Sequence, residues 1–160
     1  MIENSSAEAD LARLHIALEL VQGELNRTMP EAPRLQVKVV PDSEWTDYHF
    51  TAYIAGPDDY WASGGGTLYG PTMESALFSV ADGVQEYLSE TTWTVWPICP
   101  QHRHGVHVRP PGTAPDWIYE GGGWTGHPVW WCRGGGGHDL AQIGQLDAPP
   151  PRGKRKRPQG

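Results

Sequence analysis

Two cysteines, each followed by a histidine, are the residues of this 160-residue chain whose types and spacing are best suited to chemistry. Cys99 precedes His102 in a Cys-Pro-x-His turn, and Cys132 precedes His138 across an arm that contains four glycines. Two sulfur and two nitrogen ligands suit zinc, which binds such mixed sets in tetrahedral geometry. The sequence therefore predicts one structural zinc site formed by these four residues.

Two other states of the cysteines stay open at this point. Proline stiffens the turn after Cys99, but the glycine-rich arm after Cys132 must lose conformational entropy to hold a metal. Buried free thiols are one alternative, and a disulfide between the two cysteines is the other. Residues 1–10 lack the basic and apolar regions of a signal peptide. We therefore expect a cytoplasmic protein, in which thiols stay reduced.

His104 and His107 are alternative ligands for the same metal, because His102 and His104 fall on one side of an extended segment. Together with His102 and Asp139, His104 and His107 also define an alternative function, a small metal-dependent hydrolase. Such an enzyme needs three protein ligands, an open coordination position and a base. The sequence has no H-E-x-x-H motif and no Gly-x-Ser-x-Gly motif, so we expect a protein without enzymatic activity.

The elements that must position these ligands begin with an acidic α-β-β-β-α module in residues 1–91. Leucines and valines from Leu11 to Leu25, at alternating spacings of three and four, predict a helix with a capping box at Ser5. A second apolar stripe, from Met73 to Leu88, predicts another helix. Three antiparallel strands are predicted between the helices, at residues 35–39, at 48–54 and at 60–61 continued at 67–69. We expect both helices to lie on one face of this sheet.

Residues 92–147 are rich in tryptophan, histidine and glycine and predict a small β-rich unit resembling a zinc ribbon. Prolines and glycines separate short segments of strand-forming residues. The predicted strands cover residues 92–98, 106–108, 117–119 and 128–131, and residues 139–146 form a last short helix or strand. Tryptophans more often cover a small sheet than form a stacking platform, so we expect them in a core.

Charge is distributed unevenly along the chain. Residues 1–90 hold fifteen acidic and four basic side chains, whereas residues 152–157 hold five basic and no acidic ones. We expect the proline-rich, basic tail of residues 148–160 to be disordered. Its cations suit nucleic-acid phosphates and suggest a second alternative function, a nucleic-acid-associated protein; they are Arg152, Lys154, Arg155, Lys156 and Arg157. The second helix has no Lys or Arg, which argues against binding of double-stranded RNA through it.

A resemblance extends over about residues 77–146. The segments that carry it are Val84-Gln85-Glu86, Val95-Trp96-Pro97-Ile98-Cys99-Pro100-Gln101-His102, Trp131-Cys132 and Ala141-Gln142-Ile143-Gly144-Gln145-Leu146. In these segments the chain is similar to small uncharacterised actinobacterial proteins that share Trp-Pro-x-Cys-Pro-x-His and an ending of Ala-x-Ile-Gly-x-Leu type. Those proteins often have Cys-Pro where this chain has Cys132-Arg133. The resemblance implies no particular activity, because none is assigned to that group.

Together these patterns predict an α+β protein with three parts: the module of residues 1–91, the zinc-bearing unit of residues 92–147 and the tail of residues 148–160. We expect it to bind a protein, as an adaptor, chaperone or inhibitor, although the sequence does not identify the partner. The Leu11–Leu25 stripe can pack on the protein's own sheet or form a homodimer, and its short length favours internal packing. No run of about eighteen apolar residues is present, so we expect no membrane span.

Overall fold

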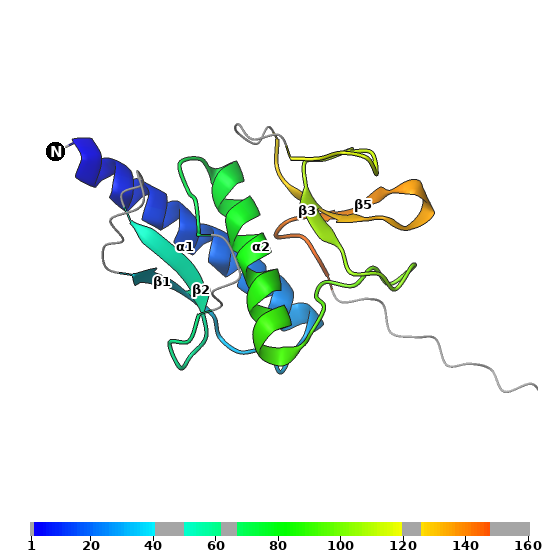
Figure 1. Cartoon of the computed structure of the whole chain (residues 1–160), viewed down its shortest axis with the longest axis horizontal. Helices are drawn as coiled ribbons and strands as arrows, with labels where there is room; N and C mark the ends of the chain where they lie inside the picture. Colours follow the sequence, from blue (N-terminus) through cyan, green and yellow to red (C-terminus); the bar gives the residue numbers. More distant parts are fainter. Residues whose placement is uncertain (1, 41–49, 62–66, 120–125, 148–160) are drawn as a thin grey trace, which may run out of the picture.

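The computed structural model describes residues 2–40, 50–61, 67–119 and 126–147 (Figure 1). Within these residues the chain forms two helices and two small antiparallel sheets, which confirms the α+β class. The elements in chain order are α1 (Ile2–Thr28), β1 (Gln36–Val40), β2 (Thr51–Ala55), α2 (Met73–Thr92), β3 (His107–Arg109), β4 (Val129–Cys132), the 3₁₀ turn η1 (Gly134–Gly136) and β5 (His138–Gln142).

The apolar stripe of α1 packs inside the protein. Leu14, Val21 and Leu25 are fully buried and belong to the hydrophobic core, where α1 packs against α2. The helix begins at Ile2, so Ser5 lies within it and is not its N-cap. The exposed face of α1 carries Ile16 and Leu20. The homodimer stays a prediction, and it would have to use this outer face because the stripe is already covered.

The second helix begins and ends at residues with clear caps. The hydroxyl of Thr72 accepts a hydrogen bond from the Ser75 backbone N–H at 3.1 Å, which satisfies one of the free donors at the helix N-terminus. At the other end Trp93 adopts the left-handed conformation, with φ 54°. Gly83 allows α2 to approach the first sheet, because a Cβ there would lie 2.9 Å from the Ile54 side chain.

The first sheet consists of β1 and β2 in antiparallel register, with Gln36 opposite Ala55 and Val40 opposite Thr51. The predicted third strand is only partly visible, since residues 62–66 lie outside the described residues. In its described part, Trp61 makes one bridge to Ala55, and the Leu68 N–H donates to the Ala52 carbonyl at 2.8 Å. These two contacts follow the edge of β2 without forming a regular ladder.

The second sheet has the strand order β3-β4-β5 and is antiparallel throughout. Two segments predicted as strands have other conformations. At residues 92–98, α2 continues to Thr92, and Ile98 forms only an isolated bridge with Gly105. At residues 117–119 no strand is formed. Of these residues only Trp117 is partly buried, with its ring 5.4 Å from the Arg109 guanidinium, whereas Ile118 and Tyr119 are exposed.

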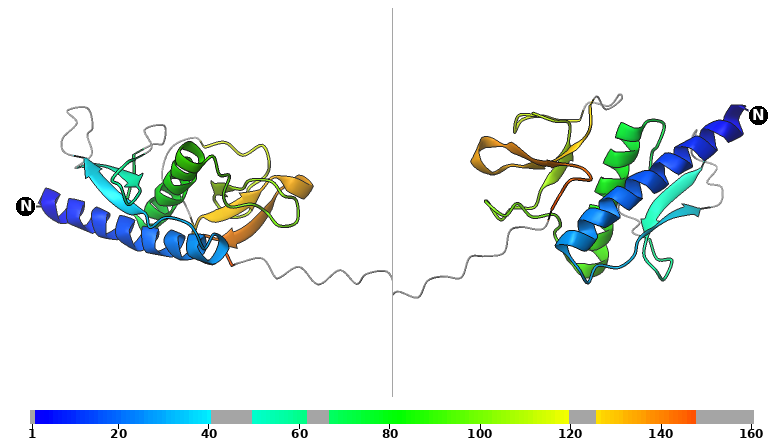
Figure 2. Two further views of the ribbon diagram at one scale, coloured as in Figure 1. Left: turned by 90° about the horizontal axis from the view of Figure 1, so that it is seen from below. Right: turned by 180° about the vertical axis from the view of Figure 1, so that it is seen from behind.

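Helix α2 lies between the two sheets, and α1 packs against α2 and runs along its underside in the left view of Figure 2 (Figures 1 and 2). Helix α2 contacts β2 on one side and β3 on the other. Buried residues from both halves of the chain form one hydrophobic cluster, in which Trp96 meets Trp130 edge to face at 5.2 Å. The two sheets are therefore coupled through one core.

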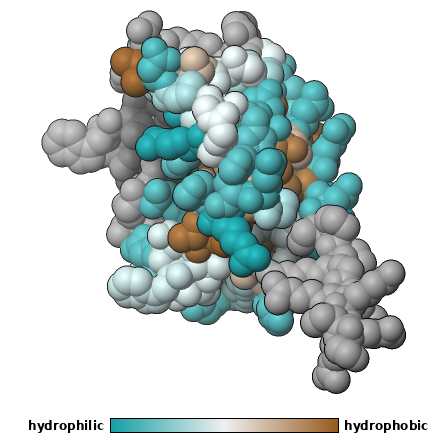
Figure 3. All heavy atoms as spheres, turned by 90° about the vertical axis from the view of Figure 1, so that its right-hand side faces the viewer, coloured by the Kyte–Doolittle hydropathy of each residue, from teal (hydrophilic) through white to brown (hydrophobic). Residues whose placement is uncertain are grey.

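The outer surface near the second sheet is mainly hydrophilic. On the face shown in Figure 3, apolar side chains form separate patches among polar ones. Neither helix of the described residues is long and apolar enough to cross a lipid bilayer.

Candidate metal centre

The four predicted ligands come from two segments that the fold brings together. Cys99 and His102 lie in the loop between α2 and β3, whereas Cys132 ends β4 and His138 begins β5. Cys132 and His138 are directly opposite each other in the β4–β5 register. The glycine-rich arm between them is therefore a hairpin turn, and pairing of the strands supplies the order that the arm itself lacks.

The ligand atoms are spaced as in a tetrahedral metal site. All four lie within 4.8 Å of one another. The His102 Nδ1 atom is 3.6 Å from the Cys99 sulfur, 3.5 Å from the Cys132 sulfur and 3.2 Å from the His138 Nε2 atom, which is itself 3.7 Å from the Cys99 sulfur. Ordinary zinc bond lengths give tetrahedral edges of about 3.6 Å between sulfur and nitrogen and about 3.3 Å between nitrogens. This cluster can hold a metal ion.

Both cysteines are free and buried, so they do not form a disulfide in this structure. Burial raises the pKa of the Cys132 thiol, and the neighbouring Cys99 raises it further, while the Gly134 N–H opposes this by donating to the sulfur at 3.3 Å. Burial disfavours the thiolate form of a cysteine unless a nearby cation compensates its charge. A bound metal would supply that cation, and the Gly134 N–H would stabilise the sulfur ligand from outside the coordination shell.

The turn at Cys99 fixes the direction of His102. The Cys99 N–H donates to the His104 carbonyl at 2.9 Å, and the Arg103 N–H donates to the Cys99 carbonyl at 2.7 Å. Arg103 adopts the left-handed conformation, with φ 58°. This tight reversal returns the chain toward β3 and leaves the His102 ring facing the two sulfurs.

Two of the glycines have specific roles that the sequence did not reveal. A Cβ at Gly134 would lie 2.2 Å from Cγ of His102, so any side chain there would displace this ligand. Gly137 has φ 94°, and a Cβ there would lie 2.6 Å from the Trp131 ring. The glycine-rich arm thus permits a close approach of backbone to ring at both of its ends.

The alternative ligands His104 and His107 lie outside the cluster formed by the described residues. His107 is on β3 opposite Trp131, and burial together with Arg109 and Arg133 lowers its pKa. The Asp139 carboxylate, the base of the alternative hydrolase, accepts hydrogen bonds from the Gly112 N–H at 3.0 and 3.2 Å. Among the described residues, His104, His107 and Asp139 belong to no cluster that could hold a metal ion. The basic tail lies outside the described residues, and nucleic-acid binding stays a prediction.

Glu24, which was not among the residues predicted from the sequence, is a buried carboxylate that joins α1 to the second sheet. Its Oε2 atom accepts a hydrogen bond from the Trp130 indole N–H at 2.9 Å. Glu24 lies three residues after Val21 in the buried stripe of α1. An acidic residue at such an apolar position was the signal that could have identified it.

The comparisons with known proteins give no relative for this chain: no family model, no curated protein and no solved structure matches it.

Proposed function

We propose that the protein is a non-enzymatic, protein-binding protein whose second sheet is held by a structural zinc ion. The zinc would bind Cys99, His102, Cys132 and His138. The observation that carries this proposal is the spacing of the four ligand atoms, which lie within 4.8 Å of one another. Four of the six edges, between 3.2 and 3.7 Å, are close to those of tetrahedral zinc.

The composition of the site favours a structural metal over a catalytic one. Structural zinc sites have four protein ligands, whereas catalytic sites keep one position for water or substrate. Here two sulfurs and two nitrogens would fill a tetrahedral shell around the ion. The carboxylate nearest in sequence, that of Asp139, is engaged by the Gly112 backbone. A hydrolase has no open position at such a site.

The segment that leads into the site supports a role in protein binding. Trp93 is 92% exposed, Val95 62% and Ile98 51%, all within seven residues of Cys99. Exposed aromatic and aliphatic side chains that are close together are typical of surfaces that contact other proteins. Because the metal would fix the loop that continues from this segment, it would also fix the presentation of these side chains. An adaptor, a chaperone and an inhibitor are all compatible with such a surface.

Metal analysis of the purified full chain tests the site. We expect about one zinc per chain by elemental analysis, and Co²⁺ substitution should give the thiolate charge-transfer absorption of a tetrahedral site with two sulfurs. Cys99→Ser should lose this absorption. The matched control is His104→Ala, which removes a nearby imidazole outside the cluster and should keep the metal. Metal-free wild-type protein, or a Cys99→Ser variant with full metal content, would contradict the proposal.

The binding role has its own test. Proteins captured from extract of the native host by the wild type are compared with those captured by Trp93→Ser combined with Ile98→Ser. We expect the double variant to keep its metal and to lose the specific partner. Equal capture by the two proteins would rule out this surface as the binding site.

A further inference from the structure

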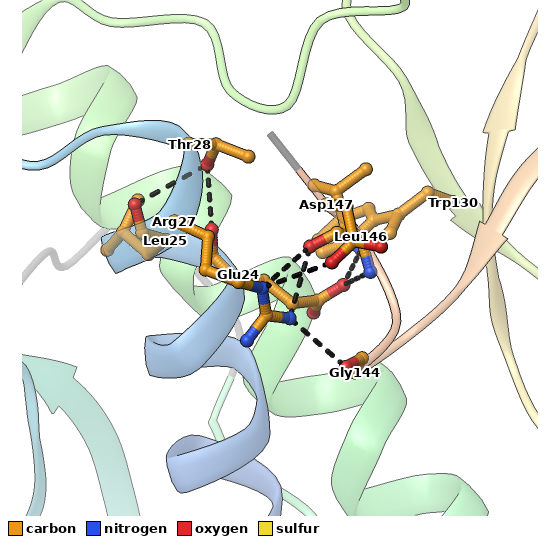
Figure 4. Close-up of polar contacts among 8 residues, drawn as sticks. All are labelled: Glu24, Leu25, Arg27, Thr28, Trp130, Gly144, Leu146 and Asp147. Carbon is orange, nitrogen blue, oxygen red and sulfur yellow. Dashed lines mark hydrogen bonds and ion pairs between the residues drawn. The ribbon is translucent and has the colours of Figure 1, made fainter. Parts of the chain in front are cut away.

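Three polar side chains near the C-terminal end of α1 contact the second half of the chain, and Figure 4 shows two of them, Glu24 and Arg27, beside Trp130 and Leu146. Glu24, Arg27 and Thr28 are separated by three and four residues in the helix and therefore lie on one face. The Thr28 hydroxyl accepts a hydrogen bond from the Trp96 indole N–H at 2.8 Å. Arg27 donates to the carbonyl of Leu146 at 3.1 Å from Nη2 and at 3.3 Å from Nε. This face of α1 is the polar attachment of the C-terminal segment.

Glu24 occupies the buried centre of this attachment. Its side chain is fully buried, and the Oε2 atom accepts two hydrogen bonds of 2.9 Å, from the Trp130 indole N–H and from the Leu146 backbone N–H. The Oε1 atom is also buried, but it has no hydrogen-bond partner among the described residues. The carboxyl group is therefore only half satisfied, although it connects three separate parts of the chain.

An ionised carboxylate is costly in this position, because a buried charge needs both hydrogen bonds and a counter-charge. Arg27 is the charged group whose field acts on Glu24. Its guanidinium is also 3.5 Å from Asp147, and both of these side chains are exposed to solvent. Burial is the largest influence and raises the pKa of Glu24, while the hydrogen bonds from Trp130 and Leu146, the nearby Gly144 backbone and the charge of Arg27 oppose it in part.

We propose that Glu24 is a proton-sensitive clasp that holds the second sheet and the segment Gly144–Asp147 against α1. The docked arrangement keeps a proton on Glu24 over a range of pH in which a glutamate in water is ionised. The hydrogen bonds from Trp130 and Leu146 favour the ionised form, but ionisation leaves a desolvated charge that they compensate only in part. Ionisation therefore disfavours the docked arrangement as a whole. The clasp rests on contacts that are independent of the metal ligands.

Opening of the clasp would change a neighbouring cavity. A cavity of about 600 Å³ is lined by residues that include Thr28, Trp96 and Leu146, together with the exposed Val95 and Ile98. Two of its wall residues, Thr28 and Leu146, are thus direct members of the attachment. Protonation of Glu24 would in this way control the shape of the apolar surface formed by Val95 and Ile98 beside the loop that carries Cys99 and His102. This consequence rests on the proposed binding role, whereas the clasp itself does not.

The sign of the pH effect follows from linkage. A carboxyl whose pKa is higher in the folded state binds its proton more tightly there than in the unfolded chain. The folded state is therefore favoured while the proton is bound, and this contribution is lost as the pH rises from the ordinary glutamate value of 4.5 through the raised pKa of Glu24. Replacing Glu24 with Gln removes this loss, because the amide is neutral at every pH.

The test is a pH titration of the full chain, followed by the Trp130 indole N–H signal in ¹⁵N–¹H spectra. Trp130→Phe assigns the signal, and elemental analysis of the same sample records the metal separately. We expect the signal to titrate with a midpoint above 4.5 in the wild type and not to titrate in Glu24→Gln. The urea midpoint of the wild type should fall relative to that of Glu24→Gln as the pH rises through this range.

Glu19→Gln is the matched control, because it removes an exposed carboxylate from the same helix, where Glu19 pairs with Arg34. It should leave the Trp130 titration unchanged. If Glu24→Gln fails to fold, the wild-type titration still decides. The clasp is overturned by a wild-type midpoint at or below pH 4.5, or by a Glu19→Gln variant that changes the Trp130 titration as much as Glu24→Gln does. A normal metal content in the same sample would leave the zinc proposal intact.

Discussion

The two sheets of this protein are held in place by different forces. The first sheet and the helices enclose aliphatic side chains, among them Leu77, Val80 and Val84, which are all buried. The second sheet has only three residues in β3, and its stability depends on specific contacts. There the Arg109 guanidinium lies 3.6 Å from the Trp131 ring centroid and donates to the Ala114 carbonyl at 2.8 Å.

The difference shows how a small unit rich in glycine and proline can be ordered. A short sheet buries little aliphatic area, and such units commonly need a metal, a disulfide or another cross-link. Here the Cys/His cluster, the cation–π contact and the Glu24 attachment join segments that the strands alone would not hold. The first half needs no such device, because its two amphipathic helices cover each other.

Metal removal should produce the largest difference in stability between the first and the second sheet. The binding free energy of a structural zinc site is of order 10 kcal/mol. Treatment with a strong chelator should therefore lower the melting temperature by roughly 10 °C or more. Hydrogen exchange should show loss of protection first in β3, β4 and β5, with α1 and α2 protected longer. Uniform loss of protection across the chain, or an unchanged melting temperature, would contradict this division.

A cavity made in the aliphatic core should lower the stability of the whole fold and leave the metal site occupied, in contrast to metal removal. Leu77→Ala removes a side chain that is almost fully buried on α2, and we expect a loss of about 3 kcal/mol in the free energy of unfolding. Metal content should not change, because the ligands lie elsewhere. Ile16→Ala on the exposed face of α1 is the control and should cost less than about 0.5 kcal/mol. Urea denaturation measures both, and metal loss in Leu77→Ala would show that the two regions are not separable.

The smallest change that tests the metal turn is a single methyl group. Gly134→Ala would place a Cβ against the His102 ring, and we expect metal affinity to fall by about 10- to 100-fold in competition with a chromophoric chelator. Gly136→Ala is the control, since it has φ 85° but open space around its Cβ. It should cost about 1 kcal/mol of stability and leave affinity unchanged. Equal losses of affinity in both variants would assign the effect to turn strain and not to His102.

Much of the first half was predictable because its signals are local. The apolar spacing of Leu14, Val21 and Leu25 marks one helix face, and the structure buries that face. Strands in the second half were less predictable. The segment of residues 92–98 has the composition of a strand, but its backbone instead follows the end of α2 and the packing of Trp96 against Trp130. The residue types of a segment indicate that it favours an extended, partly buried conformation. Whether it also forms the hydrogen-bond ladder of a sheet depends on the segments packed beside it in the fold.

The sequence by itself determined the chemical types at the candidate site: two thiols and two imidazoles, at spacings that suit a turn and a hairpin arm. Tertiary structure alone decided that their atoms lie within 4.8 Å of one another, that Gly134 must lack a side chain beside His102, and that Glu24 of α1 is buried against Trp130. The reason is physical. Ligand type is a property of single residues, whereas coordination distance and desolvation depend on segments that are up to 122 residues apart in the chain.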